Sequence, residues 1–194
     1  RPNRRQRQMC IRDRNYDTQT NQLCKTFFAS AESPVALDFS AIAKGYAVDR
    51  VSDYLTQQGF KNYLVDVGGE LWAEGSNPEG IAWQLAIENP EADLAVVRQT
   101  VHRTLSLSDA AVATSGDYRN FYERDGRRYS HTIDPHTGYP VEHTLASVTI
   151  VADSVAWADA WATAILSAGP VKGREWAVDY GLAVYLIERD NSVE

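Results

Sequence analysis

The sequence predicts an α+β fold in which mixed, largely antiparallel sheets pack against a few helices. Apolar, β-branched runs of strand length recur between clusters of turn residues. The dipeptide Asp125-Gly126 lies between two such runs and indicates a β-hairpin. Segments with helical periodicity are few and do not alternate with the strands as they would in a doubly wound sheet, so the α+β class is favoured.

In the first half of the chain, one helix and several strands are predicted. Ser40 can cap a helix that begins near Ala41 and ends at Gly59. The residues predicted to share the apolar face of this helix are Ala43, Tyr46, Ala47 and Tyr54. Strands are predicted over residues 62–67, 83–88, 94–101 and 105–107.

In the second half, a short helix is predicted over residues 110–113 and a loop over 114–116. The hairpin around Asp125-Gly126 pairs residues 120–124 with residues 127–133. The remaining predicted elements are a β-branched strand over 145–151, a helix that Asp153 or Ser154 caps and Gly169-Pro170 ends, a helix over 171–180 and a strand over 182–188.

The composition favours one globular domain with an acidic body. The 194 residues are 44% hydrophobic and carry a net charge of −7, although six arginines lie within the first 14 residues. The body is therefore more acidic than the whole chain, which argues against nucleic-acid binding as the main activity. Residues 1–24 are predicted to be a disordered or non-native leader, and the alternative is a basic arm that binds nucleic acid. Residues 25–194 form the predicted domain, and no apolar run is long enough to span a membrane.

Asp159 and Thr163 are the first candidates for a binding site. They are four residues apart on a predicted helix, so they share one face with Val155, Ala162 and Leu166. A carboxylate within an apolar stripe is costly unless it is paired or bound to a metal. A salt bridge or a cap to a neighbouring segment is the alternative explanation. If a metal binds, a carboxylate and a hydroxyl favour Mg²⁺ or Ca²⁺ over zinc.

Lys44 lies in the first turn of a predicted helix, where the helix dipole would favour an acid. A cation beside free backbone N–H groups forms a local site for phosphate. Asp38, just upstream, could accept hydrogen bonds from a ligand or hold this lysine. The alternative is an exposed lysine with Asp38 as a local cap. The sequence contains neither a P-loop nor the GxGxxG pattern of dinucleotide-binding folds.

The segment 130–138 contains His131, Asp134 and His136, and it admits several interpretations. A zinc site would need a third strong ligand, which is not spaced for it. A Ser–His–Asp hydrolase with Ser115 as its nucleophile would be expected to show a GxSxG elbow, which is absent. A general acid or base at a strand end remains open for His131, and turn formation is the interpretation that we adopt for His136.

Two glycine-containing segments are weaker candidates. Asp66-Val67-Gly68-Gly69-Glu70 follows a predicted strand, and its glycines either let the backbone approach a ligand or simply turn the chain. Thr114-Ser115-Gly116-Asp117-Tyr118 could line a pocket with small side chains and N–H groups, or could form only a turn.

Taken in order, these motifs resemble those of one family. The segments around Asp38 and 41–49, then 67–70, 113–118, 131–140 and 158–164, are similar to the successive signatures of the ApbE family, the FAD:protein FMN transferases. The resemblance runs from about Leu37 to the C-terminus. It implies an α+β fold with a core like that of the T-fold proteins.

The resemblance also implies roles for individual residues. Asp38 and Lys44 would contact FAD, with Lys44 near its pyrophosphate, and Ile133 would contact FAD through its backbone. Mg²⁺ would be bound by Asp159, Thr163 and the Ala41 carbonyl. His131 would be the catalytic residue that transfers a proton. The implied reaction moves FMN from FAD to a threonine or serine hydroxyl of an acceptor protein, a redox subunit, and releases AMP.

The resemblance leaves two other functions open and implies a location. A pyrophosphatase on the same scaffold would split FAD into FMN and AMP with water as the acceptor. A non-catalytic protein would bind FAD without releasing AMP. Members of the family carry a substantial N-terminal region that residues 1–24 do not match, so the chain is expected to be N-terminally incomplete. The implied location is periplasmic or at the cell envelope, membrane-anchored in full-length members, although no signal is visible in this chain.

Overall fold

The central element of the fold is a five-stranded sheet. The computed structural model describes residues 14–25, 38–90, 101–117, 121–124 and 127–189. Its main sheet has the order β11 (Ala183–Glu188), β10 (Leu145–Ala152), β7 (Ala110–Gly116), β4 (Glu70–Glu74) and β3 (Tyr63–Val67). All four strand pairs of this sheet are antiparallel, which confirms the largely antiparallel α+β class predicted from the sequence.

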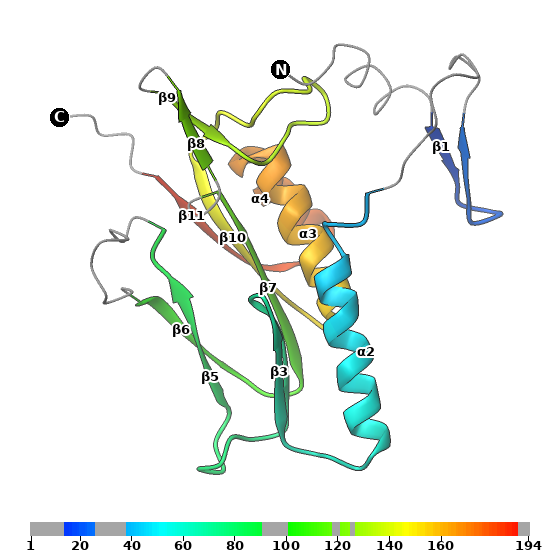
Figure 1. Ribbon diagram of the computed structural model, residues 1–194, viewed down its shortest axis with the longest axis vertical. Helices are drawn as coiled ribbons and strands as arrows, with labels where there is room; N and C mark the ends of the chain where they lie inside the picture. The colour runs from blue at the N-terminus through cyan, green and yellow to red at the C-terminus, as the bar shows by residue number, and fades with distance from the viewer. Residues whose placement is uncertain (1–13, 26–37, 91–100, 118–120, 125–126, 190–194) are drawn as a thin grey trace.

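Three helices among the described residues lie together beside this sheet, as Figure 1 shows. They are α2 (Ala43–Gln57), α3 (Val155–Ala168) and α4 (Pro170–Asp179). Helix α3 packs on β7 and β10, α2 packs on β3, β4 and α3, and α4 packs on α3 and β11. Helix α3 therefore lies at the centre of the helical layer, in contact with both other helices.

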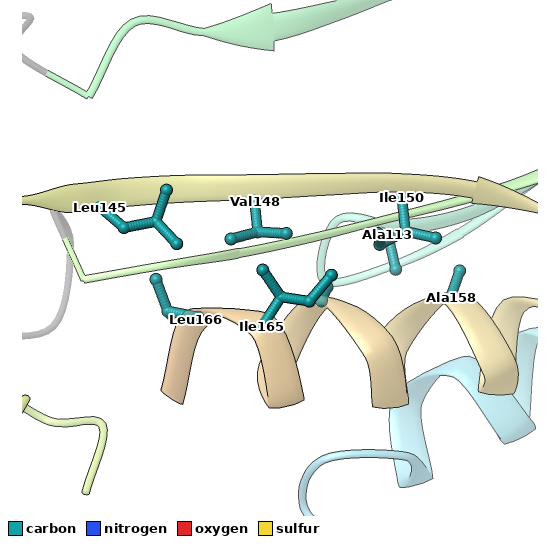
Figure 2. Packing of buried hydrophobic residues seen from close by; sticks show 8 residues of the cluster. Ala113, Leu145, Val148, Ile150, Ala158, Ile165 and Leu166 are labelled. Carbon is teal, nitrogen blue, oxygen red and sulfur yellow. The ribbon is translucent and has the colours of Figure 1, made fainter. Parts of the chain in front are cut away.

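The main core lies between α3 and strands β7 and β10. Figure 2 shows side chains from the two strands facing side chains from the helix across this interface. The fully or almost fully buried members are Ala113, Leu145, Val148, Ile150, Ala158, Ala162, Ile165 and Leu166. Burying each of the larger aliphatic side chains contributes about 1.5–3 kcal/mol, so this cluster fixes α3 firmly on the sheet.

Several predicted elements are confirmed closely. Ser154 caps α3, its hydroxyl accepting from the Trp157 N–H at 3.3 Å, and Gly169 ends the helix with a φ of 87°. Strands β8 (Phe121–Arg124) and β9 (Arg127–Ser130) pair antiparallel on either side of residues 125–126. Strand β5 (Trp83–Glu88) has its predicted bounds. It pairs antiparallel with β6 (Val101–Leu107), of which only residues 105–107 were predicted as a separate strand and residue 101 as the end of another.

The prediction of a helix over residues 110–113 is wrong, because these residues begin strand β7. The predicted loop over residues 114–116 belongs to the same strand. Alanine favours helices, but here Ala111 and Ala113 are fully buried and β7 pairs with both β4 and β10. Small side chains at these positions let α3 approach the sheet, and this tertiary packing overrides the local preference.

The prediction of which face of α2 is buried is also wrong. Tyr46 and Tyr54 are 59% and 60% exposed, whereas the buried residues of the helix are Gly45, Val48 and Ser52. A Cβ atom at Gly45 would lie 2.4 Å from the Val155 carbonyl oxygen. The helix therefore presents its smallest residue to α3, because the two backbones approach too closely for a larger side chain there.

The N-terminal segment includes a hairpin of β1 (Arg14–Asp17) and β2 (Gln22–Lys25), so the boundary expected after residue 24 falls inside β2. Of the predicted strand over 94–101, only its last residue falls within the described residues, where it begins β6. Within the described ranges, no helix combines the length and apolar character needed to cross a membrane.

Candidate functional site

A cleft of about 920 Å³ brings the predicted site residues together. We call it the central cleft. Its walls come from the chain before and within α2, the turn after β3, strands β5, β6 and β7, the segment after β9, and α3. All seven predicted residues line it: Asp38, Ala41, Lys44, His131, Ile133, Asp159 and Thr163. Residues separated by more than 100 positions therefore share one site.

The chain enters α2 through a polar turn at Asp38. Its Oδ1 accepts hydrogen bonds from the Ser40 hydroxyl and from the Ser40 N–H, the latter at 2.8 Å. Both hydrogen bonds lower the pKa of Asp38, and the bond from the Ser40 hydroxyl has the larger effect. This exposed carboxyl group is therefore ionised at neutral pH. Ser40 thus belongs to the turn. The N-terminal cap of α2 is Ile42, which offers no side-chain hydrogen bond, so the predicted capping role of Ser40 is wrong.

Asp159 lies where α2 and α3 meet. Its carboxylate is 2% exposed, and Oδ2 accepts a hydrogen bond from the Gly45 N–H at 3.1 Å. Burial raises the pKa of Asp159, and the Gly45 N–H and the positive charge of Lys44 oppose this shift. Among the described residues, the Gly45 N–H is the hydrogen-bond donor to this carboxylate, and it bonds to Oδ2 and not to Oδ1. The carboxylate therefore keeps one oxygen for a ligand in the central cleft.

Two further oxygen donors line the same cleft. The Thr163 hydroxyl, one turn after Asp159, is 3.1 Å from the Ser115 hydroxyl. Within the described chain, the Ala41 carbonyl accepts no backbone hydrogen bond from α2, because the Gly45 N–H that would reach it is directed to Asp159. A carboxylate, a hydroxyl and a carbonyl form an all-oxygen donor set, which fits Mg²⁺ or another hard cation.

Zinc-like ligation is not found. In the parts of the chain that the structure describes, no three His, Cys, Asp or Glu side chains are grouped to hold a metal. The proposed oxygen donor set contains only one carboxylate, so it is not a group of this kind. The absence of such a group therefore argues against a zinc site but not against a site for Mg²⁺.

Lys44 points from the first turn of α2 to an acid on β4. Its Nζ donates a hydrogen bond to Oε1 of Glu70, and the Lys44 side chain stays 47% exposed. Glu70 is 1% exposed, and burial raises its pKa against the opposing hydrogen bond and charge of Lys44. The segment 66–70 was noted in the sequence for its glycines, and the pairing of Glu70 with Lys44 was not predicted.

The segment after β9 places His131 and Ile133 at the central cleft and His136 away from it. Asp134 organises the turn: its Oδ1 accepts from the His136 N–H at 2.8 Å, and its carbonyl accepts from the Gly138 N–H at 2.8 Å. An isolated bridge between Ile133 and Pro140 closes the loop. This geometry agrees with the turn-forming interpretation of the segment around His136.

The hydrolase interpretation finds no support in the hydrogen bonds of Ser115. Its hydroxyl bonds to Thr163, and among the described residues it makes no hydrogen bond to a histidine. A serine nucleophile would need a base within hydrogen-bonding distance.

An apolar wall of the cleft was not predicted. It is formed by Leu71 and Val112 of the main sheet and by Leu85, Ile87 and Leu105 of the β5–β6 hairpin. The alternation of Leu85 and Ile87 with other residues indicates one apolar strand face, but the sequence does not reveal that this face covers the cleft. The wall suits a flat, apolar ligand group beside the polar end of the site.

Asp49 fixes the helix that carries Asp159 and Thr163. Its carboxylate accepts from the Val155 N–H at 2.8 Å, the Ala156 N–H at 3.0 Å and the Ser154 hydroxyl at 2.8 Å. An acid from α2 thus satisfies the free N–H groups at the start of α3. Two successive turns of α2 therefore contact α3, one through Gly45 and the other through Asp49.

Comparison with known proteins identifies the family to which this chain is similar. The model of the ApbE family matches residues 2–186, which include all but the first residue of the segment expected to be a leader. The FAD:protein FMN transferase of Escherichia coli (strain K12) is 39% identical over 173 residues, which are 89% of this chain and 48% of that protein. The enzyme of the same name from Haemophilus influenzae is 42% identical over 168 residues, covering 87% of this chain and 48% of that protein.

Two solved structures are similar as well. The flavin transferase ApbE from Vibrio cholerae has a TM-score of 0.78 and 37% identity, over 96% of this chain and 56% of that one. The apo form of the Pseudomonas stutzeri flavinyl transferase ApbE has a TM-score of 0.72 and 44% identity, over 92% of this chain and 51% of that one. The chain thus spans about half the length of the relatives that it matches.

Proposed function

The chain belongs to the ApbE family, and from this premise we propose that it carries the catalytic cleft of a magnesium-dependent flavin transferase. In this proposal, FMN is transferred from FAD to a threonine or serine hydroxyl of an acceptor protein, and AMP is released. The observation that carries the proposal is the convergence of Asp38, Lys44, His131 and the buried Asp159 on one cleft. The names of the similar proteins support the same activity.

The polar end of the central cleft would bind the pyrophosphate of FAD. The ammonium of Lys44 would contact the pyrophosphate oxygens, and Asp38 and the backbone of Ile133 would hold other parts of FAD. The apolar wall on the β5–β6 hairpin is suited to the flat flavin ring. Binding of this kind fixes the reacting phosphorus in position, and positioning supplies much of the catalysis in phosphoryl transfer.

Asp159, Thr163 and the Ala41 carbonyl would hold the magnesium ion. The bound ion would supply neutralisation of the charge on the pyrophosphate oxygens. In the transfer itself, the acceptor oxygen forms a bond to the FMN phosphorus and the bond from that phosphorus to the AMP oxygen breaks. His131 would take the proton from the acceptor hydroxyl, and AMP leaves with the bonding electron pair.

The test is a flavin-transfer assay with this chain, FAD and Mg²⁺. The acceptor is a domain that the Escherichia coli FAD:protein FMN transferase labels in a parallel reaction, which serves as the positive control. We expect covalent flavin on the acceptor, seen as fluorescence after denaturing electrophoresis, together with an equal amount of AMP. EDTA and the variant Asp159→Asn should abolish both signals.

Other outcomes would contradict this proposal in recognisable ways. Free FMN and AMP without a labelled acceptor would indicate a pyrophosphatase. Binding of FAD without release of AMP, unaffected by Asp159→Asn, would indicate a non-catalytic flavin-binding protein.

A further inference from the structure

Glu70 is a buried acid to which the proposed reaction gives no role. It is the first residue of β4, follows Gly68-Gly69, and is 1% exposed. Oε1 accepts the hydrogen bond from Lys44, whereas Oε2 is buried without a hydrogen-bond partner among the described residues. An ionised carboxylate with an unpaired buried oxygen destabilises a fold, so its presence requires a reason beyond packing.

Glu70 holds the ammonium group of Lys44, a residue that lines the central cleft. A lysine ammonium ends a flexible four-carbon chain, and fixing it in one place costs rotamer entropy. Lys44 also lies in the first turn of α2, where the positive end of the helix dipole disfavours a cation. A negative partner on the sheet offsets both effects and determines where the ammonium lies.

Gly68 leaves room for the side chain of Lys44 to reach Glu70. A Cβ atom at Gly68 would be 3.7 Å from Cδ of Lys44 and 3.8 Å from Oε2 of Glu70, so the stem of the lysine passes over this glycine. Gly68 and Lys44 line the central cleft, and Glu70 is not among its lining residues. Glu70 therefore acts on the cleft through Lys44.

We propose that Glu70 is a positioning residue that fixes the Lys44 ammonium against the β3–β4 turn, so that it faces a flavin-nucleotide pyrophosphate in the central cleft. This inference rests on the proposed function for the identity of the ligand. It deepens that function by assigning the orientation of the phosphate-binding lysine to an acid that does not touch the ligand. Asp159 is a second anion near Lys44, but the hydrogen bond of the ammonium goes to Glu70.

The first experiment measures where Lys44 lies, without any ligand. In the Glu70→Met variant, which keeps the side-chain length and removes the acceptor oxygens, nuclear Overhauser contacts between the Lys44 Hδ protons and the Gly68 Hα protons should fall several-fold. Contacts between β3 and β4 across their register report whether the fold is intact. Unchanged contacts between Lys44 and Gly68 in a folded variant would overturn the proposal.

The second experiment is a double-mutant cycle on FAD affinity, measured by quenching of flavin fluorescence. Glu70→Met should weaken FAD binding about tenfold, the effect of one charge-assisted hydrogen bond, and should leave binding of riboflavin, which lacks phosphate, unchanged. Adding Glu70→Met to Lys44→Met should cause no further loss. Additive losses would mean that Glu70 acts independently of Lys44, and would overturn the proposal.

The two experiments separate this inference from the function on which it rests. A wild-type chain that binds FAD no more tightly than riboflavin would contradict the proposed function, because no pyrophosphate is then recognised. The contacts of Lys44 with Gly68 would still decide whether Glu70 holds the lysine.

Discussion

Asp159 shows how much of the site depends on a single residue. Its carboxylate is buried, carries a raised pKa and receives one hydrogen bond, from Gly45. The sequence predicted that Asp159 lies within an apolar helical stripe, but it did not predict the hydrogen bond from Gly45. It could not predict Glu70, whose partner Lys44 lies 26 residues away on another element. Long-range pairs of this kind leave no periodic pattern in the chain.

Replacing Asp159 by asparagine should remove binding of divalent cations. The amide keeps the shape of the side chain but loses the charge that attracts the ion, so we expect affinity for Mg²⁺ or Mn²⁺ to fall more than about tenfold. Isothermal titration calorimetry on the unliganded chain measures this change. The matched control is Asp153→Asn, at an exposed acid just before α3. Equal losses in the two variants would contradict the assignment of Asp159.

Glu70 should make the fold less stable as the pH rises. Its pKa is raised in the folded state, so the folded chain binds more protons than the unfolded chain between the ordinary value of about 4.3 and the raised value. Its contribution to stability is therefore present below the ordinary pKa and is lost as the pH rises through the folded one. Glu70→Met should gain stability relative to wild type between pH 4 and pH 7, as measured by urea unfolding. A difference that stays constant over this range would contradict the expectation.

At the scale of elements, the contact between α2 and α3 decides the geometry of the site. Gly45 lets the two backbones meet, and Asp49 binds the N–H groups at the start of α3. The caps of α3 and the Asp125-Gly126 hairpin could be predicted, because their turn chemistry is local. Strand β7 could not, because its alanines favour a helix until β4 and β10 pair with it. The same limit applies to the buried face of α2, which is set by the neighbouring helix.

Substituting Gly45 by alanine should push α2 away from α3. The new Cβ atom would lie 2.4 Å from the Val155 carbonyl oxygen and 2.7 Å from the Ala156 Cα, and backbone atoms cannot move aside independently. We expect a loss of about 1–3 kcal/mol in the free energy of unfolding, together with weaker cation binding. Urea unfolding and calorimetry measure the two effects.

Gly173→Ala is the control for Gly45→Ala. Its Cβ would lie 2.6 Å from a methyl group of Ile165, which is a side chain in the main core on another face of α3. This variant should lose stability but keep its affinity for the cation. Cation binding that falls equally in both variants would show that general destabilisation, and not the α2–α3 contact, is the cause.

At the scale of the whole molecule, the central cleft joins the helical layer to the β5–β6 hairpin. The β5–β6 hairpin contacts the sheet at two places. At the end of β4, the Trp83 Nε1–H donates to the Glu74 carbonyl at 2.9 Å. On β11, the ring of Tyr185 lies against His102 and Arg103. A ligand that contacts both parts should hold them together. The sequence predicted the strands of this hairpin in part, and their position over the cleft emerges only from the assembled fold.

Binding of FAD with Mg²⁺ should therefore stabilise the chain and protect the hairpin. At a ligand concentration of one hundred times Kd, the expected gain in free energy of unfolding is about 2.7 kcal/mol. Amide hydrogen exchange should slow in β5 and β6, whose residues line the cleft, and change little in α4, which contributes none of its described lining. Equal protection of α4 would contradict a ligand seated in this cleft.

The hydrogen bond from Gly45 to Asp159 has a consequence for the order in which the protein is made. The two residues are 114 positions apart. A ribosome that has already produced Lys44 and Glu70 must still add residues 71–159 before the site contains Asp159. A growing polypeptide thus carries Lys44 and its partner Glu70 before it carries the carboxylate of Asp159. Nascent chains that end before Asp159 should bind neither a divalent cation nor FAD productively, and both abilities should arise once Asp159 has been added.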